Sequence, residues 1–147
     1  MDLNHPDLIN NLLSGYDATD GALGGTNGGC KGDDAHGTCC SGIMGAEDNS
    51  IGVKGVSYNS KIIPIRIAYG NTFPLPYTSW VSEVSWIANG IYNAWSVYGA
   101  DVLSNSWGGP YNDAIANEIK NDIEKAKQKG VVGTPSVEID GVLYLGM

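Results

Sequence analysis

Apolar runs and amphipathic stretches alternate along this chain, and their order leaves few architectures open. Residues 61–67 form a compact, isoleucine-rich run that is typical of a buried strand, and residues 102–107 form a second one. Residues 81–98 place apolar side chains at the 3-4-3 spacing of an amphipathic helix, and residues 114–129 repeat that pattern. An order of strand, helix, strand and helix with these segment lengths predicts parallel strands with right-handed crossovers. It therefore predicts an α/β layer architecture.

Prolines and glycines punctuate this pattern. Pro64 stands inside the first apolar run, where it cannot donate a hydrogen bond to a strand ladder. Residues 70–76 are predicted to form a loop. Near the C-terminus, residues 136–139 and 142–145 flank an Asp-Gly dipeptide, which is a strong signal for a two-residue hairpin turn. The predicted sheet is therefore followed by a β-hairpin.

Composition argues against several classes of function. The 147 residues suffice for one domain, and 8 Lys and Arg against 16 Asp and Glu give a net charge of −8. Nucleic acid is not expected as a partner, because phosphate binding needs a basic face. No apolar run approaches the ~20 residues of a membrane span, and no basic-then-apolar leader begins at Met1. The 3 cysteines include no Cys-x-x-Cys pair, which argues against a disulfide framework or a zinc knuckle.

The N-terminal third is acidic and rich in glycine. Half of the residues from Gly21 to Gly32 are glycine, which predicts a loop. Residues 33–46 are mostly small, and Asp34 is placed to cap a helix over them. The acidic stretch is either a solvated loop face or a cation site, since Ca²⁺ binds carboxylate, amide and carbonyl oxygens on flexible loops.

His36 is the main candidate for chemistry. It is one of 2 histidines, with His5, and it stands beside Asp33 and Asp34 where the helix is predicted to begin. An imidazole held at a helix start and partly exposed suits a general base. The alternative is a structural histidine that serves only as a hydrogen-bonded group.

The residues around His36 resemble the segment around the catalytic histidine of the subtilisin-like serine proteases. The similarity begins with Asp34-Ala35-His36-Gly37-Thr38 and continues with Cys40 and Gly42. Five further segments match that family in order and spacing: His5–Leu8, Asn49–Val56, Ile62–Ile67, Ser85–Ile91 and Val102–Gly109. The resemblance covers residues 1 to about 109 and implies part of a subtilisin-like parallel sheet with flanking helices.

The resemblance implies a Ser-His-Asp triad with an oxyanion hole, of which this sequence matches only His36. The catalytic aspartate would fall a few residues before Met1, and the nucleophile segment would lie far downstream. Residues 133–136 contain Gly-Thr-Pro-Ser, in which proline separates threonine from serine, so they do not match that segment. A base without a nucleophile transfers nothing, and we expect no protease activity above background from this chain alone.

The resemblance also implies a calcium site and a substrate-binding strand. Side-chain oxygens of Asp7 and Asn49 and carbonyl oxygens of Glu47, Ile51 and Val53 would bind the ion, although a further N-terminal ligand of the family is absent from this sequence. An extended peptide or protein substrate would pair with the backbone of Ser106, Trp107, Gly108 and Gly109. The alternative for Trp107 is a place in the core.

The cysteines give a further comparison. Cys40 matches the cysteine that proteinase K-like and kexin-like members carry four residues after the histidine, which implies a buried thiol beneath the site. Cys39 stands where many members have His or Arg, and two adjacent cysteines cannot form an unstrained disulfide. Cys30, in the glycine loop, is expected to be free.

The C-terminal segment resembles a different family, the thioredoxin-fold disulfide oxidoreductases. In that family a helix leads into Gly-Val-x-Gly-Thr-Pro with a cis proline, here Thr134-Pro135, and then a hairpin. The redox Cys-x-x-Cys is missing. These observations predict a partial subtilisin-like domain over 1–112 and a thioredoxin-like tail over 113–147, joined between Gly109 and Gly130.

Three functions follow from these resemblances. The first is a fragment of a subtilisin-like endopeptidase that is inactive alone. The second is a non-catalytic peptide-binding or interaction module on a chimeric α/β scaffold, and the third is a redox remnant. Members of the subtilisin-like family are usually secreted or extracytoplasmic, which leaves the location of this chain open.

Overall fold

The computed structural model describes residues 1–26, 28–29, 35–72, 78–110, 112–128, 136–139 and 142–145. The chain divides into two compact units, Met1–Pro110 and Tyr111–Met147. This division falls close to the boundary predicted between residues 112 and 113.

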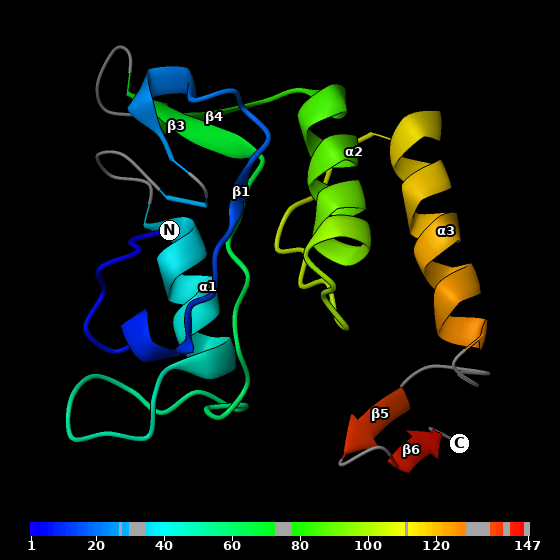
Figure 1. Ribbon diagram of the computed structural model, residues 1–147. Coiled ribbons are helices and arrows are strands. Elements are labelled where there is room, and N and C mark those ends of the chain that lie inside the picture. The colour runs from blue at the N-terminus through cyan, green and yellow to red at the C-terminus, as the bar shows by residue number, and fades with distance from the viewer. Residues whose placement is uncertain are drawn as a thin grey trace. The chain divides into compact units, whose positions relative to one another are not determined.

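The described residues of the first unit include two α-helices. α1 (His36–Gly45) forms from the predicted small-residue segment, and α2 (Val84–Tyr92) forms from the amphipathic stretch (Figure 1). α2 continues into a π-helical turn, η3 (Asn93–Val97), and ends before Gly99, whose φ of 71° favours glycine. The prediction of a helix from residue 81 began too early, because Val81 belongs to a strand. Two short 3₁₀ turns precede α1: η1 (Ile9–Asn11) and η2 (Ala22–Gly24).

A small parallel sheet confirms the predicted α/β class. β1 (Tyr16–Asp17) pairs in parallel with β2 (Ile65–Arg66), and a further parallel bridge joins Leu12 to Ile62. Within the run predicted as one strand, only residues 65 and 66 form a ladder, because Pro64 has no N–H to donate. The carbonyl oxygen of Pro64 still accepts a hydrogen bond from Tyr16 N at 3.0 Å.

Residues 70–72, predicted to begin a loop over residues 70–76, belong to a strand instead. β3 (Ala68–Thr72) pairs antiparallel with β4 (Thr78–Ser82), with Gly70 opposite Trp80 (Figure 1). Aromatic and β-branched residues such as Tyr69 and Val81 favour strands, and here they outweigh the turn signal of the glycine. Residues 73–77 lie outside the described part of the chain.

The strand predicted at residues 102–107 is wrong. These residues have no regular secondary structure, and Val102 is 83% exposed. Among the described residues no strand pairs with them. A strand needs a partner edge for its backbone hydrogen bonds, and these residues have irregular structure.

Helices cover both faces of the strand that contains β2. A Cβ atom added at Gly45 of α1 would lie 3.0 Å from Ile62 Cδ1, and one at Gly90 of α2 would lie 3.2 Å from Ile65 Cγ2. Figure 1 shows this segment running between α1 and α2. The core is small: among the described residues the buried apolar side chains are Leu8, Ala18, Ala46, Ile91 and Ala94.

The described residues of the second unit form a helix and a pair of strands. α3 (Asp113–Gln128) matches the predicted amphipathic helix, and β5 (Ser136–Ile139) pairs antiparallel with β6 (Val142–Leu145), as predicted. The hairpin turn and the predicted Thr134-Pro135 turn lie outside the described residues. None of the helices in the described part of the chain is long and apolar enough to cross a membrane.

Candidate active site

His36 is the first residue of α1, and its side chain is exposed. The cap position before it is held by Ala35, whose side chain makes no capping hydrogen bond. Asp34, which was predicted to cap this helix, lies outside the described residues, as does Cys30. The N-terminal segment holds the first turn of the helix in place, because Asp2 N donates a 2.8 Å hydrogen bond to Thr38 Oγ1.

Two side chains flank the imidazole. Cys40 Sγ lies 3.9 Å from His36 Nε2, as expected for residues four apart on one face of a helix. The indole of Trp80 meets the imidazole edge to face, with ring centroids 5.7 Å apart and an interplanar angle of 66°. The expectation of a buried thiol at Cys40 is wrong, since Cys40 is half-exposed; the adjacent Cys39 is exposed.

Trp80 is the residue near the site that the sequence did not indicate. It lies on β4, just after the predicted loop of residues 70–76, and it is 52% exposed. A tryptophan in a stretch with β-branched and aromatic neighbours, after a segment that contains two prolines, could have suggested a strand. Trp80 follows His36 by 44 positions in the sequence, and no local pattern predicts that the two side chains lie close together.

The described neighbours of the exposed imidazole are a thiol and an indole. Among the described residues no carboxylate or hydroxyl contacts the His36 ring. An isolated imidazole of this kind can exchange a proton with water or with a bound group. Within the described residues, neither a group that orients the ring nor the nucleophile that a triad requires is in contact with it.

The predicted substrate-binding strand is open to solvent. Ser106, Trp107, Gly108 and Gly109 are all exposed, and Trp107 is 39% exposed. The alternative that Trp107 belongs to the core is therefore wrong. Its Nε1 donates a 3.0 Å hydrogen bond to Asn105 Oδ1. Within the described residues no contact joins this segment to His36, so the structure does not bring these two predicted parts together.

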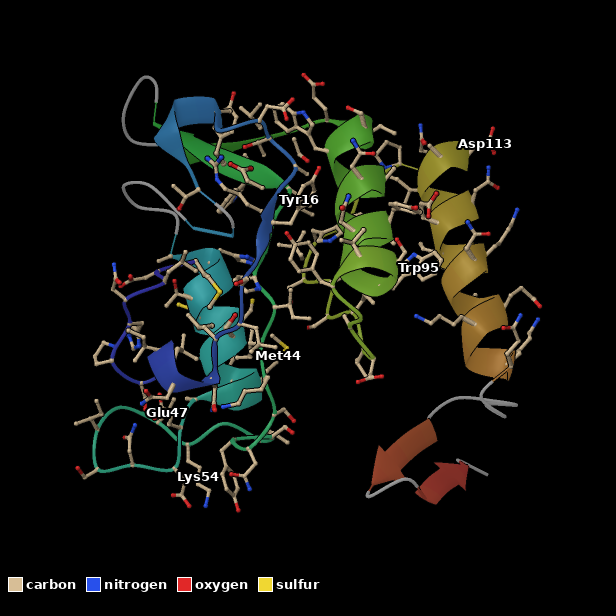
Figure 2. All side chains as sticks on the ribbon, in the orientation of Figure 1. Tyr16, Met44, Glu47, Lys54, Trp95 and Asp113 are labelled. Atoms are coloured by element: carbon tan, nitrogen blue, oxygen red, sulfur yellow. The ribbon has the colours of Figure 1, made fainter. Side chains whose placement is uncertain are left out.

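The residues predicted to bind calcium do come together, around the carboxylate of Asp7. This side chain is buried, with the residue only 3% exposed. Asn49 Nδ2 donates to Asp7 Oδ1 at 3.0 Å, and Val53 N donates to Asp7 Oδ2 at 2.8 Å. Glu47 N donates to the Asp7 carbonyl oxygen at 2.9 Å. The loop of residues 47–53 therefore closes over one carboxylate (Figure 2, which labels Glu47).

The donor set of this loop suits a hard cation in residue type. Asp7 offers a carboxylate, Asn49 an amide oxygen, and the backbone of residues 47, 51 and 53 carbonyl oxygens, which are the ligands that Ca²⁺ prefers. Several of these oxygens already accept hydrogen bonds. For example, Ile51 N donates to Asn49 Oδ1 at 2.8 Å. Each carboxylate oxygen keeps a second lone pair. Among the described residues no group of three His, Cys, Asp or Glu side chains could hold a metal ion.

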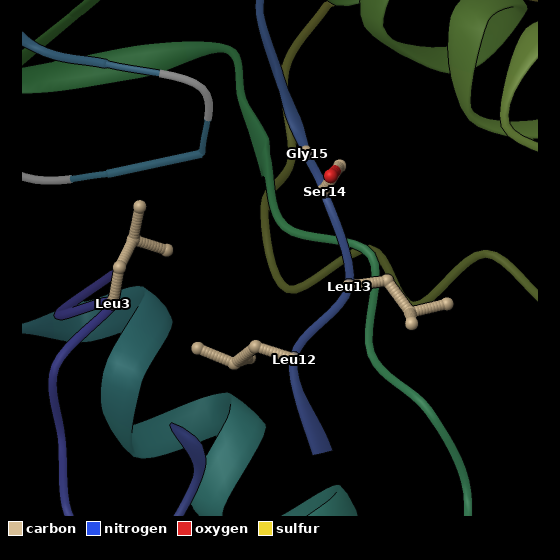
Figure 3. A pocket seen from close by; sticks show the side chains of 5 residues that line it. All are labelled: Leu3, Leu12, Leu13, Ser14 and Gly15. Carbon is tan, nitrogen blue, oxygen red and sulfur yellow. The ribbon is translucent and has the colours of Figure 1, made fainter. Parts of the chain in front are cut away.

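A shallow apolar hollow lies apart from His36, beside β1. Leu3, Leu12, Leu13, Ser14 and Gly15 line about 330 Å³ of space (Figure 3). It is open to solvent and contains no titratable side chain, so it offers no group for catalysis.

The comparisons place this chain among the subtilases. The model of the subtilase family matches residues 1–137, and the chain belongs to that family. It is 30% identical over 127 residues to the major intracellular serine protease of Bacillus subtilis strain 168, and 34% identical over 119 residues to thermitase of Thermoactinomyces vulgaris. Fervidolysin of Fervidobacterium pennivorans is 31% identical over 142 residues.

These alignments cover most of this chain and a minor part of each relative. They include 83%, 80% and 90% of the chain but 37%, 38% and 18% of the respective relatives. The chain therefore spans about a third of the length of the first two curated relatives.

The thioredoxin-like tail is not supported. The subtilase match runs through α3 and into β5, which begins at Ser136. The resemblance to an oxidoreductase rested on a helix, the Gly-Val-x-Gly-Thr-Pro segment and a hairpin, without the redox cysteines.

Proposed function

We propose that this chain is a fragment of a subtilisin-like serine endopeptidase that keeps His36 as its one triad residue and does not hydrolyse peptides by itself. The observation that carries the proposal is the environment of His36. Its imidazole stands at the start of α1, exposed, in a chain of the subtilase family. Among the described residues, the ring has Cys40 and Trp80 beside it and no aspartate or serine. In a triad, the loss of any member leaves only residual catalysis.

Turnover of a fluorogenic peptide tests this proposal directly. We expect the purified chain and its His36→Ala variant to give the same rate as buffer. A fluorophosphonate probe, which labels an activated serine, should leave the chain unlabelled. Turnover that disappears in His36→Ala would show that a nucleophile is present and would overturn the proposal.

The second candidate function is binding of an extended peptide without cleavage. Its support is the exposed segment Ser106–Gly109, whose backbone has no strand partner among the described residues. Titration calorimetry with an uncleavable apolar peptide tests it. Binding should weaken in Trp107→Ala and stay unchanged in Val102→Ala, which removes a neighbouring exposed apolar side chain. Equal loss in both variants would argue against a role for Trp107.

Calcium binding by the loop of residues 47–53 is a further proposal. Asp7 and Asn49 would supply side-chain oxygens, and Glu47, Ile51 and Val53 would supply carbonyl oxygens. The support is that these residues already contact one another around a buried carboxylate. A bound ion would hold the loop closed. It would take no part in proton transfer by the His36 imidazole.

The test for calcium is thermal unfolding in excess CaCl₂ and in excess chelator. A ligand at 100 times its dissociation constant stabilises by about 2.7 kcal/mol, so a rise in Tm with CaCl₂ is expected. Asn49→Ala should remove this rise, whereas Asp48→Ala, a neighbouring exposed acid, should leave it intact. The same Tm with calcium and with chelator would contradict the proposal.

A further inference from the structure

The loop of residues 17–25 closes around the guanidinium of Arg66. Arg66 Nη1 donates to Asp17 Oδ2 at 3.3 Å and to Thr19 Oγ1. Arg66 Nη2 donates to Ala22 O at 2.9 Å. The side chains of Arg66 and Asp17 are only 3% and 7% exposed. A carboxylate, a hydroxyl and a backbone carbonyl therefore meet one cation inside the protein.

The loop sets the positions of these oxygens through its own hydrogen bonds. Thr19 N and Thr19 Oγ1 donate to Asp17 Oδ1 at 2.8 and 2.6 Å, and Gly21 N donates to Asp17 Oδ2 at 3.2 Å. A hydroxyl has one proton, so Thr19 gives it to Asp17 and presents its lone pairs to Arg66. The acceptors are thus oriented toward the guanidinium by the loop itself rather than by solvent.

Two neighbours match the flat shape of the guanidinium. Gly25 packs so close that a Cβ atom there would overlap the group, and Arg66 Cζ lies over the Tyr69 ring, 5.7 Å from its centroid. An aromatic face attracts an organic cation. Arg66 Nε is buried and has no hydrogen-bond partner within the described part of the chain. The recognised part of the group is therefore its outer edge, the two terminal nitrogens that every alkylguanidinium carries.

The oxygens of this loop suit a guanidinium better than a metal ion. Ca²⁺ takes roughly six to eight oxygen ligands, whereas the Arg66 guanidinium is met by one oxygen each from Asp17, Thr19 and Ala22. A planar fork of donors fits separated acceptors of this kind, and a compact ammonium does not. The sequence left the acidic stretch open as a solvated face or a cation site. Around Asp17 the structure favours a cation site with an internal cation.

We propose that the loop of residues 17–25 is a binding site selective for a guanidinium group, which the side chain of Arg66 fills in the folded chain. Shortening that side chain should open the site to a free alkylguanidinium ion. Recognition would use the same oxygens and the same aromatic face. The contacts that form the site involve neither His36 nor the loop of residues 47–53, so it is independent of catalysis and of calcium.

Chemical complementation of Arg66→Ala is the first test. Ethylguanidinium contains the atoms that this substitution removes beyond Cβ. Arg66→Ala should unfold at a lower Tm than the unaltered chain, and millimolar ethylguanidinium should recover at least half of the lost Tm. Ethylammonium, which carries the same charge on a compact head, should recover none. The unaltered chain should gain nothing from either ion, because Arg66 already fills the site.

Two further variants separate recognition of shape from loss of charge. Arg66→Lys keeps the charge but not the planar fork, and its Tm should also fall. Lys54→Ala removes the cation of an exposed ion pair with Asp48. It opens no site around a guanidinium, so ethylguanidinium should not raise its Tm. Circular dichroism checks that both variants fold.

NMR of the unaltered chain keeps the test decisive if Arg66→Ala does not fold. Arg66 is the one arginine in the sequence, so its side-chain signals are unambiguous. Near neutral pH the Nη protons should give separate signals and exchange slowly with water, because the loop blocks rotation of the group and shields it from solvent.

Four results would overturn the proposal. One is a folded Arg66→Ala variant that ethylguanidinium does not stabilise, and another is equal recovery with ethylammonium. The third is a Tm of Arg66→Lys equal to that of the unaltered chain. The fourth is a single averaged Nη signal from Arg66. None of these results depends on peptide hydrolysis or on calcium binding.

Discussion

Arg66 Nη1 lies 3.3 Å from Asp17 Oδ2, and their side chains are only 3% and 7% exposed. The guanidinium also donates to Thr19 Oγ1 and to Ala22 O, the latter at 2.9 Å. Gly25 packs against the same guanidinium so closely that a Cβ atom there would overlap it. One buried cation on β2 thus organises the loop that leads from β1 toward α1.

Removing one partner of this ion pair should destabilise the first unit strongly. Asp17→Asn leaves the Arg66 charge buried with weaker compensation, and breaking a buried pair typically costs about 3–5 kcal/mol. Urea unfolding followed by circular dichroism measures the loss. Lys54→Met, which removes a partner of an exposed ion pair, is the matched control and should change stability little. Equal losses of stability in the two variants would contradict the conclusion that the buried pair of Arg66 and Asp17 stabilises the first unit strongly.

Gly52 should be intolerant of a side chain, whereas Gly42 should accept one. Gly52 has a φ of 60°, and a Cβ atom there would overlap the carboxylate of Asp7. The left-handed conformation alone costs an alanine about 1–2 kcal/mol, and displacement of Asp7 adds to that. A Cβ at Gly42, within α1, meets nothing within 4 Å. Gly42→Ala should therefore stabilise the helix by about 0.5–1 kcal/mol.

Thermal unfolding of these two glycine variants gives the comparison. A stable Gly52→Ala variant would mean that the loop of residues 47–53 does not close over Asp7. Failure of Gly42→Ala to stabilise would mean that α1 is constrained in some other way at that position.

The contact between Trp80 and His36 should be visible by NMR. An indole held 5.7 Å from an imidazole shifts the ring protons of the histidine through its ring current. Trp80→Ala should move the His36 ring resonances toward their positions in an unfolded chain. Trp95→Ala, in η3, should leave them in place. Unchanged His36 resonances in Trp80→Ala would mean that β4 does not carry its indole to the imidazole.

The ion pair between Lys54 and Asp48 should weaken in alkaline solution. Lys54 Nζ lies 2.7 Å from Asp48 Oδ2, and this hydrogen bond raises the pKa of Lys54 above its ordinary value of 10.5. A pKa raised by folding means that the stabilisation is fully present below the unfolded pKa of Lys54. It is lost as the pH rises through the higher folded value. Figure 2 labels Lys54 on this loop.

A carbon-detected NMR titration of Lys54 measures this effect. Asp48→Asn should lower the pKa of Lys54 toward 10.5, because the charged acceptor is gone. A titration curve that is the same in both proteins would show that the ion pair is not formed in solution.

The sequence predicted those parts of the fold that local pattern controls. α1, α2, α3 and the β5–β6 hairpin follow from small-residue or amphipathic spacing and from a turn dipeptide. The exposed His36 at a helix start and the gathering of residues 47–53 around Asp7 followed from the resemblance to subtilases.

The failures concern interactions between distant segments. Residues 102–107 have the composition of a strand, but strand formation depends on a partner edge that composition does not reveal. The β3–β4 hairpin and the position of Trp80 beside His36 depend on pairing across a loop. Cys40 is half-exposed rather than buried. The exposure of a cysteine depends on how other segments pack around it, and residue type alone does not predict that packing.

The small core has a calorimetric consequence. Ordinary domains gain about 12–15 cal/mol/K per residue in heat capacity on unfolding, because apolar surface becomes hydrated. Here large apolar side chains such as Ile43, Val56 and Val102, at 69%, 88% and 83% exposure, are already hydrated in the folded chain. The heat-capacity change per residue should be smaller than usual, and the stability curve of this protein should be correspondingly flat across temperature.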